Sequence, residues 1–445
     1  MLSLSGQPIR DCDGISRRSL LKIGTLGLGG LTLADLLALR SQAATNAASG
    51  IATRKTSVIF FEMAGGPTHF ETYDPKPDAP EEYRGPMKAI QTALPGVNFC
   101  EVLPEQAKIA DKLAIIRSIH HDSASHGTSS HLTQTGYYLR DVQNRANEMP
   151  SIGSIAARLR GPNAPGMPSF VSMPRAMRYG TAAWFGKAYN PFVVDGDPSQ
   201  ADFKVNNLFL EGDLTLGRLD TRRGLLDSLD AQRRMVDNEG VSAALDQFTR
   251  QAFEMLTTDR AREAFKLTQE SEAMRDRYGR TVTGQSLLLA RRLVESGVTF
   301  VTVRMNDSWD DHVSVEKRMR DKAPAFDRGL AALINDLYER GLDRDVMVVA
   351  MGEFGRTPRI NPGAGRDHWG AVMSVLMSGG GLRVGQVIGS SNAKGEVPHD
   401  QPYRPEDVLA TVYRHLGIDP AATYNDLAGR PRYILERRET IGELV

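Results

Sequence analysis

Short apolar runs recur along the chain at intervals typical of an α/β protein. Each run holds five or six residues, rich in β-branched and aromatic types and without polar alternation, which is typical of strands covered on both faces. We predict six strands, at Thr56–Phe61, Leu113–Ser118, Ser169–Met173, Thr299–Arg304, Val346–Met351 and Val372–Met377. Helical periodicity lies between them, at Ser151–Arg160, Ser286–Ser296, Pro324–Arg340 and Pro405–Leu416. This alternation predicts an α/β fold with a mostly parallel central sheet and helices on both faces.

One stretch, about residues 218–278, interrupts the alternation. It is charged, has no strand-like run, and shows helical periodicity at Arg222–Gln232, Ala243–Leu256 and Asp259–Met274. We expect it to form a helical insertion in the sheet domain. The preceding segment Asn190–Phe209 is rich in Pro, Asp and Asn, which predicts a long surface loop.

Residues 1–44 have the features of an export signal. The pair Arg17 and Arg18 precedes the apolar stretch Ile23–Leu39, and small residues follow. Paired arginines in this position indicate the twin-arginine route, so we expect the export machinery as a partner and a periplasmic or secreted protein. An amphipathic helix with two surface arginines is the alternative. Asp35 within the apolar stretch leaves open whether the segment is cleaved or retained as an anchor.

The charge balance excludes some classes of partner. Lys plus Arg and Asp plus Glu both number 54, so we expect no binding to nucleic acid or to anionic membranes. After the signal segment, no apolar run approaches the roughly 20 residues that cross a bilayer. Loss of Cys12 with the signal would leave Cys100 alone, without an internal disulfide.

Histidines and carboxylates are concentrated beside the predicted strand ends. Four of the nine histidines fall within twelve residues after the second strand, namely His120, His121, His126 and His131. Imidazole is a frequent ligand of zinc-like ions, so this group predicts contact with a metal ion or a substrate. The alternative is a polar loop whose histidines cap a helix and bind the backbone.

Other candidate ligands flank the later strands. Asp310 and His312 follow the fourth strand, Glu353 follows the fifth, and Asp367 and His368 precede the sixth. In open α/β sheets, loops at the carboxyl ends of the strands usually form the active site. Asp367 could instead orient the His368 ring from a second layer.

Three further positions leave alternatives open. Arg356 presents a planar fork for phosphate, sulfate or carboxylate, or forms an ion pair with Glu353 or Asp367. Asp307 is either a ligand or the N-cap of a helix. After the first strand, which ends at Glu62, the pair Gly65–Gly66 allows close backbone approach to a ligand. His69 and Glu71 alternate in the same loop, and both could face the cleft.

The run GEFGRTPRINPGAGRDHWG at 352–370, together with the earlier SWDDH, resembles the DUF1501 family, which is itself similar to a divergent branch of the alkaline phosphatase/sulfatase superfamily. The resemblance implies an alkaline phosphatase-like three-layer fold over residues 55–445, with metal ligands near Glu62, Asp310, His312, Glu353 and His368. Phe354 stands where the superfamily has a ligand histidine, which favours one ion over two. His126 stands where a Cys, Ser or Thr nucleophile is expected. Either the nucleophile has moved to a neighbouring hydroxyl or covalent transfer has been lost; the neighbouring hydroxyls are Ser123, Ser125 and Thr128.

These features predict a hydrolase of phosphate or sulfate esters that acts on a small-molecule or glycan ester. We expect a divalent ion (zinc, manganese or calcium) and catalytic roles for His126 and Arg356. The candidate metal ligands are Glu353, His368, Asp310, His312, Asp367, Glu62 and His69. The alternative is a non-catalytic periplasmic binding protein on the same scaffold.

Overall fold

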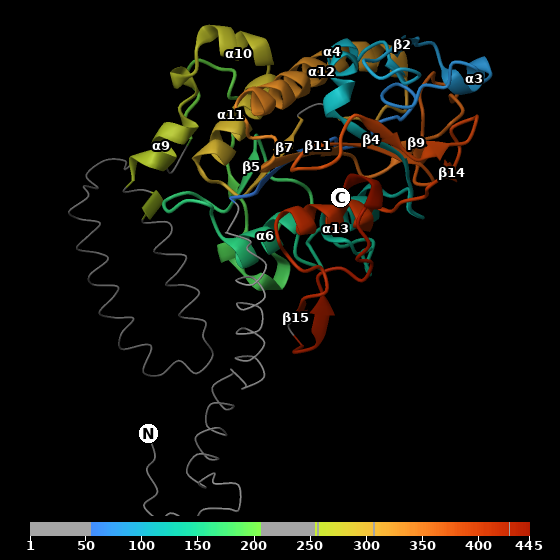
Figure 1. Cartoon of the computed structure of the whole chain (residues 1–445). Helices are drawn as coiled ribbons and strands as arrows, with labels where there is room; N and C mark the ends of the chain where they lie inside the picture. The colour runs from blue at the N-terminus through green and yellow to red at the C-terminus, as the bar shows by residue number, and fades with distance from the viewer. Residues whose placement is uncertain (1–54, 206–253, 256–257, 306–307, 427) are drawn as a thin grey trace, which may run out of the picture. The chain divides into compact units, whose positions relative to one another are not determined.

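An eight-stranded sheet forms the centre of the computed structural model, which describes residues 55–205, 254–255, 258–305, 308–426 and 428–445 (Figure 1). The strand order is β12-β4-β11-β8-β1-β7-β5-β6. In chain order the strands are β1 (Ser57–Glu62), β4 (Ala114–Ile119), β5 (Phe170–Met173), β6 (Phe192–Val193), β7 (Phe300–Arg304), β8 (Val346–Met351), β11 (Met373–Gly379) and β12 (Gln386–Ile388). All six predicted strands are confirmed. The additional strand β6 lies in the segment that we expected to be a loop.

The direction of β11 determines where the loops of the sheet meet. β1 runs parallel to β7 and β8, β5 runs parallel to β6 and β7, and β4 runs parallel to β12. β11 is antiparallel to both of its neighbours, β4 and β8. The sheet is therefore mostly parallel, as predicted. The segment that enters β11 reaches the same edge as the carboxyl ends of the other strands.

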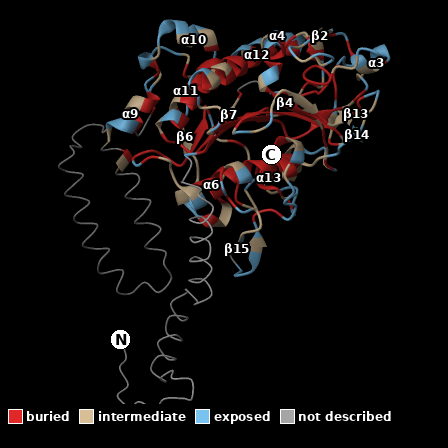
Figure 2. Ribbon diagram, viewed as in Figure 1, coloured by how far each residue is buried: buried red, intermediate tan, exposed pale blue. Residues whose placement is uncertain are grey.

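Successive residues of each strand enter two separate cores, one on each face of the sheet. In β1, Ile59 and Phe61 belong to the first core, whereas Val58 and Phe60 belong to the second. All four are fully buried, and the strands are accordingly the most buried part of the chain in Figure 2. Side chains alternate across a strand, so a strand that is apolar at every position requires helices on both faces.

Helices α4, α11 and α12 cover the first face, and α6 and α13 cover the second (Figure 1). The helices are α3 (Glu81–Arg84), α4 (Pro104–Lys108), α5 (His126–Thr135), α6 (Ile152–Arg160), α9 (Asp259–Phe265), α10 (Glu272–Tyr278), α11 (Val282–Ser296), α12 (Val315–Glu339) and α13 (Pro405–His415). The four predicted helices are present. However, α12 begins nine residues before Pro324, the residue that we expected to start it. Its apolar stripe runs through the proline, because Met319, Ala323 and Phe326 are all fully buried.

The predicted insertion is described only in part. Its last candidate helix, Asp259–Met274, corresponds to α9 and the start of α10. The export signal, Arg222–Gln232 and most of Ala243–Leu256 lie outside the described residues. Among the residues that the structure describes, no helix is both long enough and apolar enough to cross a membrane.

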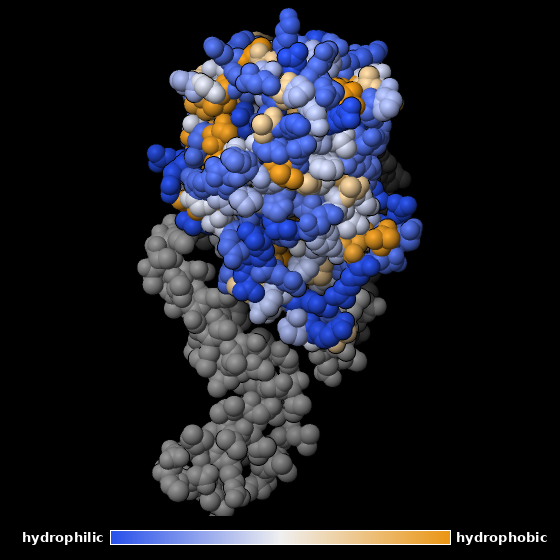
Figure 3. Space-filling model, turned by 90° about the vertical axis from the view of Figure 1, so that its right-hand side faces the viewer, coloured by the Kyte–Doolittle hydropathy of each residue, from blue (hydrophilic) through white to orange (hydrophobic). Residues whose placement is uncertain are grey.

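In the described part of the chain, four short antiparallel strand pairs lie outside the central sheet. The pairs are β2 (Ala89–Gln91) with β3 (Asn98–Cys100), β9 (Gly355–Arg356) with β10 (His368–Trp369), β13 (Ser390–Ser391) with β14 (Pro398–Asp400), and β15 (Thr423–Asn425) with β16 (Pro431–Tyr433). On the face shown in Figure 3, hydrophobic residues form small, separate patches in a largely hydrophilic surface. The pair β9–β10 brings the two ends of the 352–370 loop together.

Gly355 packs so closely against the start of β11 that a side chain would displace it. A β-carbon at this position would lie 2.1 Å from the carbonyl oxygen of Val372. We expect Gly355→Ala to lower the free energy of unfolding by about 1–3 kcal/mol, as overpacking usually does. Urea denaturation measures this change. Gly442→Ala is the matched control, because no atom lies within 4 Å of its added β-carbon. Equal stability of the two variants would contradict this account.

Candidate metal centre

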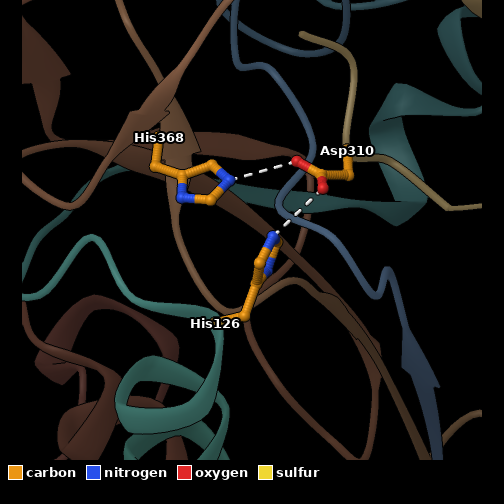
Figure 4. A group of neighbouring side chains, drawn as sticks. All are labelled: His126, Asp310 and His368. Atoms are coloured by element: carbon orange, nitrogen blue, oxygen red, sulfur yellow. Dashed lines mark hydrogen bonds and ion pairs between the residues drawn. The ribbon is translucent and has the colours of Figure 1, made fainter.

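Three side chains from separate loops meet at the carboxyl edge of the sheet. His126 is the first residue of α5, Asp310 lies in the loop between β7 and α12, and His368 is the first residue of β10. Their potential ligand atoms all lie within 4.8 Å of one another. Figure 4 shows both imidazole rings directed at the carboxylate of Asp310, which lies between them.

A fourth side chain, that of His312, lies against this group. Asp310 Oδ2 is 3.2 Å from Nε2 of His126, and its Oδ1 is 3.1 Å from Nε2 of His368 and 3.0 Å from Nε2 of His312. The Nε2 atoms of His312 and His368 are 3.0 Å apart. Three imidazoles therefore present the same ring nitrogen to one carboxylate.

The opposite nitrogen of each ring fixes its tautomer. Nδ1 of His126 faces Oε1 of Glu353 at 2.7 Å, and Nδ1 of His312 faces Oδ1 of Asp367 at 2.7 Å. Nδ1 of His368 faces the carbonyl oxygen of Ala124 at 2.9 Å. Ionised carboxylates and carbonyls only accept hydrogen bonds, so each Nδ1 is the N–H donor. In the neutral ring, Nε2 then carries a lone pair.

With all three rings neutral and protonated on Nδ1, three Nε2 lone pairs would face the carboxylate of Asp310. Such an arrangement is repulsive unless a cation or additional protons lie among them. Around a tetrahedral zinc-like ion with ligand distances of 2.0–2.1 Å, neighbouring ligand atoms are about 3.3 Å apart. The separations of 3.0–3.2 Å between Asp310 and the imidazoles fit this spacing. The residues therefore fit a divalent cation.

The pKa directions within the cluster follow from burial and from the neighbouring charges. Burial lowers the pKa of His126, but the adjacent carboxylates of Glu353 and Asp310 outweigh it, so the net pKa is raised. Burial and the neighbouring His126 lower the pKa of His368. Burial raises the pKa of Asp310, yet its contact with Arg356 brings the pKa well below the usual range. The hydrogen bond to His312 lowers the pKa of Asp367.

Arg356 anchors the carboxylate of Asp310. Its guanidinium is fully buried and contacts Asp310 Oδ1 at 2.5 Å. It also donates hydrogen bonds to the carbonyl oxygens of Gly65, Gly66 and Arg366. The alternative to an anion-binding fork was an ion pair with Glu353 or Asp367; the structure has an ion pair, but with Asp310. Arg356 joins the loops after β1, β7 and β8 and is not available as a fork for a substrate.

Glu353 lies in a second layer, although the sequence indicated a ligand. Besides its contact with His126, both of its oxygens accept the N–H of Gly65, at 2.9 and 3.0 Å. Gly65 and Gly66 have φ values of +108° and +81°, in the region that favours glycine. This conformation turns the N–H of Gly65 toward Glu353 and both carbonyls toward Arg356. Asp367 has the same orienting position behind His312.

Two predicted ligands lie outside the cluster. His69 is buried, and its Nε2 faces the carbonyl oxygen of Gly395 at 2.9 Å. Burial lowers the pKa of His69 to about 4, so the ring is neutral. Glu62 is 4% exposed, and its Oε2 lies 3.5 Å from Nε of Arg304. Burial raises the pKa of Glu62 to about 8, against the opposing charge of Arg304.

The remaining histidines of the 120–131 segment support the loop and do not join the cluster. His121 Nε2 lies 2.7 Å from the carbonyl oxygen of Glu353, and His131 Nε2 accepts the N–H groups of Glu148 and Met149. Asp307 lies outside the described residues. Phe354 is fully buried, and its ring centroid is 5.0 Å from that of His126 and 4.6 Å from that of His368. It therefore forms an apolar wall on one side of the cluster.

A family model described as "Protein of unknown function (DUF1501)" matches residues 55–445. The chain belongs to this family. No curated protein sequence matches this DUF1501 chain.

Solved structures with a similar fold include three hydrolase and synthase chains. The sulfatase PsFucS1 from Pseudoalteromonas sp. is 13% identical, with a TM-score of 0.37 over 86% of this chain and 71% of that chain. A TAB5 alkaline phosphatase variant with bound Mg is 9% identical, with a TM-score of 0.38 over 82% and 99%. The lipoteichoic acid synthase LtaP from Listeria monocytogenes is 9% identical, with a TM-score of 0.32 over 82% and 73%. Similarities this low carry no argument about the activity of the DUF1501 chain.

The geometry ranks the side chains by their effect on metal affinity. We expect His126→Ala and His368→Ala to weaken binding of zinc or manganese by more than about a hundredfold, because each removes a ligand. Glu353→Gln, which alters an orienting group, should cost about tenfold to a hundredfold. Titration of the metal-free protein measures the affinities. His399→Ala is the control, because this histidine is exposed on β14. Equal affinities in all four variants would exclude the cluster as the metal site.

Glu62 should make the stability of the metal-free protein depend on pH. Its pKa is raised from 4.5 to about 8, so the unfolded chain loses this proton before the folded protein does. Stability therefore falls as the pH rises between these two values and levels off above the higher one. Glu62→Gln cannot titrate. We expect its stability advantage over wild type to grow by a few kcal/mol from about pH 5 to pH 8.5 in urea denaturation, since one pKa unit is about 1.4 kcal/mol. A constant difference would contradict the raised pKa.

Proposed function

We propose that the chain is an exported, metal-dependent hydrolase of phosphate or sulfate esters. The main support is the cluster at the carboxyl edge of the sheet, where the Nε2 atoms of three imidazoles approach the carboxylate of Asp310. Each imidazole is held from behind by an oxygen acceptor. Such second-layer acceptors are typical of metal-binding histidines. A purely structural cleft has no need of this arrangement.

The donor set indicates the class of metal. His126, His312 and His368 offer nitrogen, and Asp310 offers oxygen. Nitrogen-rich sites suit zinc and related transition metals, whereas calcium prefers sites made of oxygen alone. Of the three ions expected from the sequence, zinc and manganese therefore fit better than calcium. A single cluster with an apolar wall at Phe354 favours one ion.

The protein residues orient the site and control its charge. A divalent ion held by these ligands would supply Lewis acidity toward an ester oxygen and toward water. Glu353 and Asp367 keep the proton on Nδ1 of their partner histidines, so that Nε2 stays free to bind. Arg356 fixes the Asp310 carboxylate and keeps it ionised. In this proposal Arg356 positions the site and does not contact the substrate.

Water is the attacking group that the site favours. The hydroxyl of Ser123 already bonds to that of Ser129 at 2.9 Å and accepts the N–H of Ser125 at 3.2 Å. His126 holds the position expected for a nucleophile, but its Nε2 faces Asp310 and its Nδ1 faces Glu353. We infer that His126 is a metal ligand and that water, activated in the cluster, attacks the ester.

The alternative is a non-catalytic periplasmic binding protein on the same scaffold. The replacement of a ligand by Phe354 and the absence of an in-register hydroxyl support it. The two proposals differ on turnover, and only the hydrolase requires a metal ion. In both, residues 1–44 direct the protein through the twin-arginine machinery, and the bound molecule is a small-molecule or glycan ester.

Turnover is tested with p-nitrophenyl phosphate and p-nitrophenyl sulfate on the purified, zinc- or manganese-loaded protein. We expect metal-dependent hydrolysis of one of the two esters. Asp310→Ala should reduce kcat/KM by at least about a thousandfold, because it removes a ligand and leaves the buried charge of Arg356 unpaired.

Asp343→Ala is the matched control. Asp343 lies in the loop before β8, at the opposite edge of the sheet, and its replacement should leave kcat/KM unchanged. Stoichiometric metal with no turnover of either ester or of sulfated and phosphorylated glycans would favour the binding protein. Failure to bind any divalent ion would exclude the hydrolase and favour the binding protein.

A further inference from the structure

Two arginines lie at the carboxyl edge of the sheet beside the metal cluster. Arg304 is the last residue of β7, and Arg178 lies five residues after the end of β5. These strands are neighbours in the sheet, on the other side of β1 from β8 and β4. The ligands His126, His368 and Asp310 thus have a cationic region next to them. Neither arginine was singled out by the sequence patterns.

Arg178 is placed against the first turn of α5. A β-carbon at Gly127 would lie 3.3 Å from Nη2 of Arg178. Because neighbouring Cα atoms are 3.8 Å apart, this guanidinium lies within about 9 Å of the Cα of His126. The absence of a side chain at Gly127 leaves space in front of the guanidinium, directly beside a proposed metal ligand.

The guanidinium of Arg178 has unused hydrogen-bond donors. The side chain is half-buried. Its guanidinium lies 5.2 Å from the centroid of the Tyr179 ring, and its charge acts to lower the pKa of the nearby Glu62 carboxyl. A guanidinium has five N–H donors. Structural arginines of this fold use theirs: Arg356 and Arg366 bind carbonyls and carboxylates on every side.

Arg304 and Glu62 complete the region. Arg304 donates weakly to the carbonyl oxygen of Ala176, at 3.4 Å, two residues before Arg178. Its other neighbour is Glu62, whose buried Oε2 has no hydrogen-bond partner among the described residues. A separation of 3.5 Å is longer than a good charge-assisted hydrogen bond. The positive charge of this region is therefore only partly neutralised by the protein.

We propose that Arg178 and Arg304 bind the tetrahedral oxyanion of the substrate, a phosphate or sulfate group, beside the metal cluster. The inference deepens the proposed hydrolase function and rests on it for the identity of the reaction. Arg178 is the main specificity-determining residue, because its planar fork matches two oxygens of such a group. Arg304 fixes the position of the group from the adjacent strand end. The ester would then enter with its anionic group toward β7 and β5.

Isothermal titration calorimetry with inorganic phosphate and with inorganic sulfate tests the pocket on the full-length, metal-loaded protein. We expect one or both anions to bind to wild type. Arg178→Gln should weaken that binding by about tenfold to a hundredfold, the effect of losing a charge-assisted pair of hydrogen bonds. Arg178→Lys keeps the positive charge but not the planar guanidinium. Its anion affinity should lie between those of wild type and Arg178→Gln. Metal content and folding should be unchanged in both variants.

Arg175→Gln is the matched control, because Arg175 is exposed in the same loop and its loss changes the net charge equally. Binding in this variant should equal that of wild type. The inference is overturned if Arg178→Gln binds both anions as wild type does, if Arg175→Gln weakens binding as much as Arg178→Gln, or if loaded wild type binds neither anion. The stronger of the two anions identifies the ester class.

This experiment separates the pocket from the hydrolase proposal. Anion binding that depends on Arg178, without turnover of any ester, would support the pocket and count against hydrolysis. Hydrolysis whose kcat/KM is unchanged in Arg178→Gln would support the enzyme and overturn the pocket. A merely structural Arg178 would lower stability without this selective loss of anion affinity.

Discussion

The buried ion pair between Arg356 and Asp310 is the interaction on which the site depends. The guanidinium has no solvent exposure, and a buried positive charge requires a carboxylate against it. Carbonyls of Gly65, Gly66 and Arg366 satisfy its other donors. One side chain thus holds the loops after β1, β7 and β8 together. The carboxylate that balances it is the one to which the imidazoles converge.

The sheet and its mostly parallel character could be predicted from the sequence, but the reversed direction of β11 could not. Runs such as Val346–Met351 are apolar at every position, and only a strand covered on both faces accounts for them. Periodicity contains no information about direction, and β11 runs opposite to its neighbours. That reversal places His368, which precedes β11, at the edge where β7 and β8 end. The place of His368 just before a strand identified it as a candidate ligand in the sequence. Its position in space became clear only from the structure.

The composition of the site was predicted better than the role of each residue. Sequence places His126, Asp310, Glu353 and His368 at strand ends, and all four lie together. A carboxylate beside this cluster can either bind the ion directly or accept a hydrogen bond from Nδ1 of a ligand histidine. Differences of a few ångströms in side-chain direction decide between these two roles. Glu353 and Asp367 have the second role, because they face Nδ1 of His126 and His312. Arg178 was missed because a lone arginine in a loop has no periodic signature, although its place just after a strand was a usable signal.

The surroundings of the cluster differ on its two sides, and this asymmetry constrains how an ester can approach. The ring of Phe354 packs against the rings of both His126 and His368, and Gly66 lies against the ring of Phe354. That side excludes water and offers no partner for an anionic group, and a charge placed there would lose hydration without compensation. Arg178 and Arg304, near the carboxyl ends of β5 and β7, offer N–H donors and positive charge instead. A phosphate or sulfate group is therefore better matched by these two arginines than by the ring of Phe354.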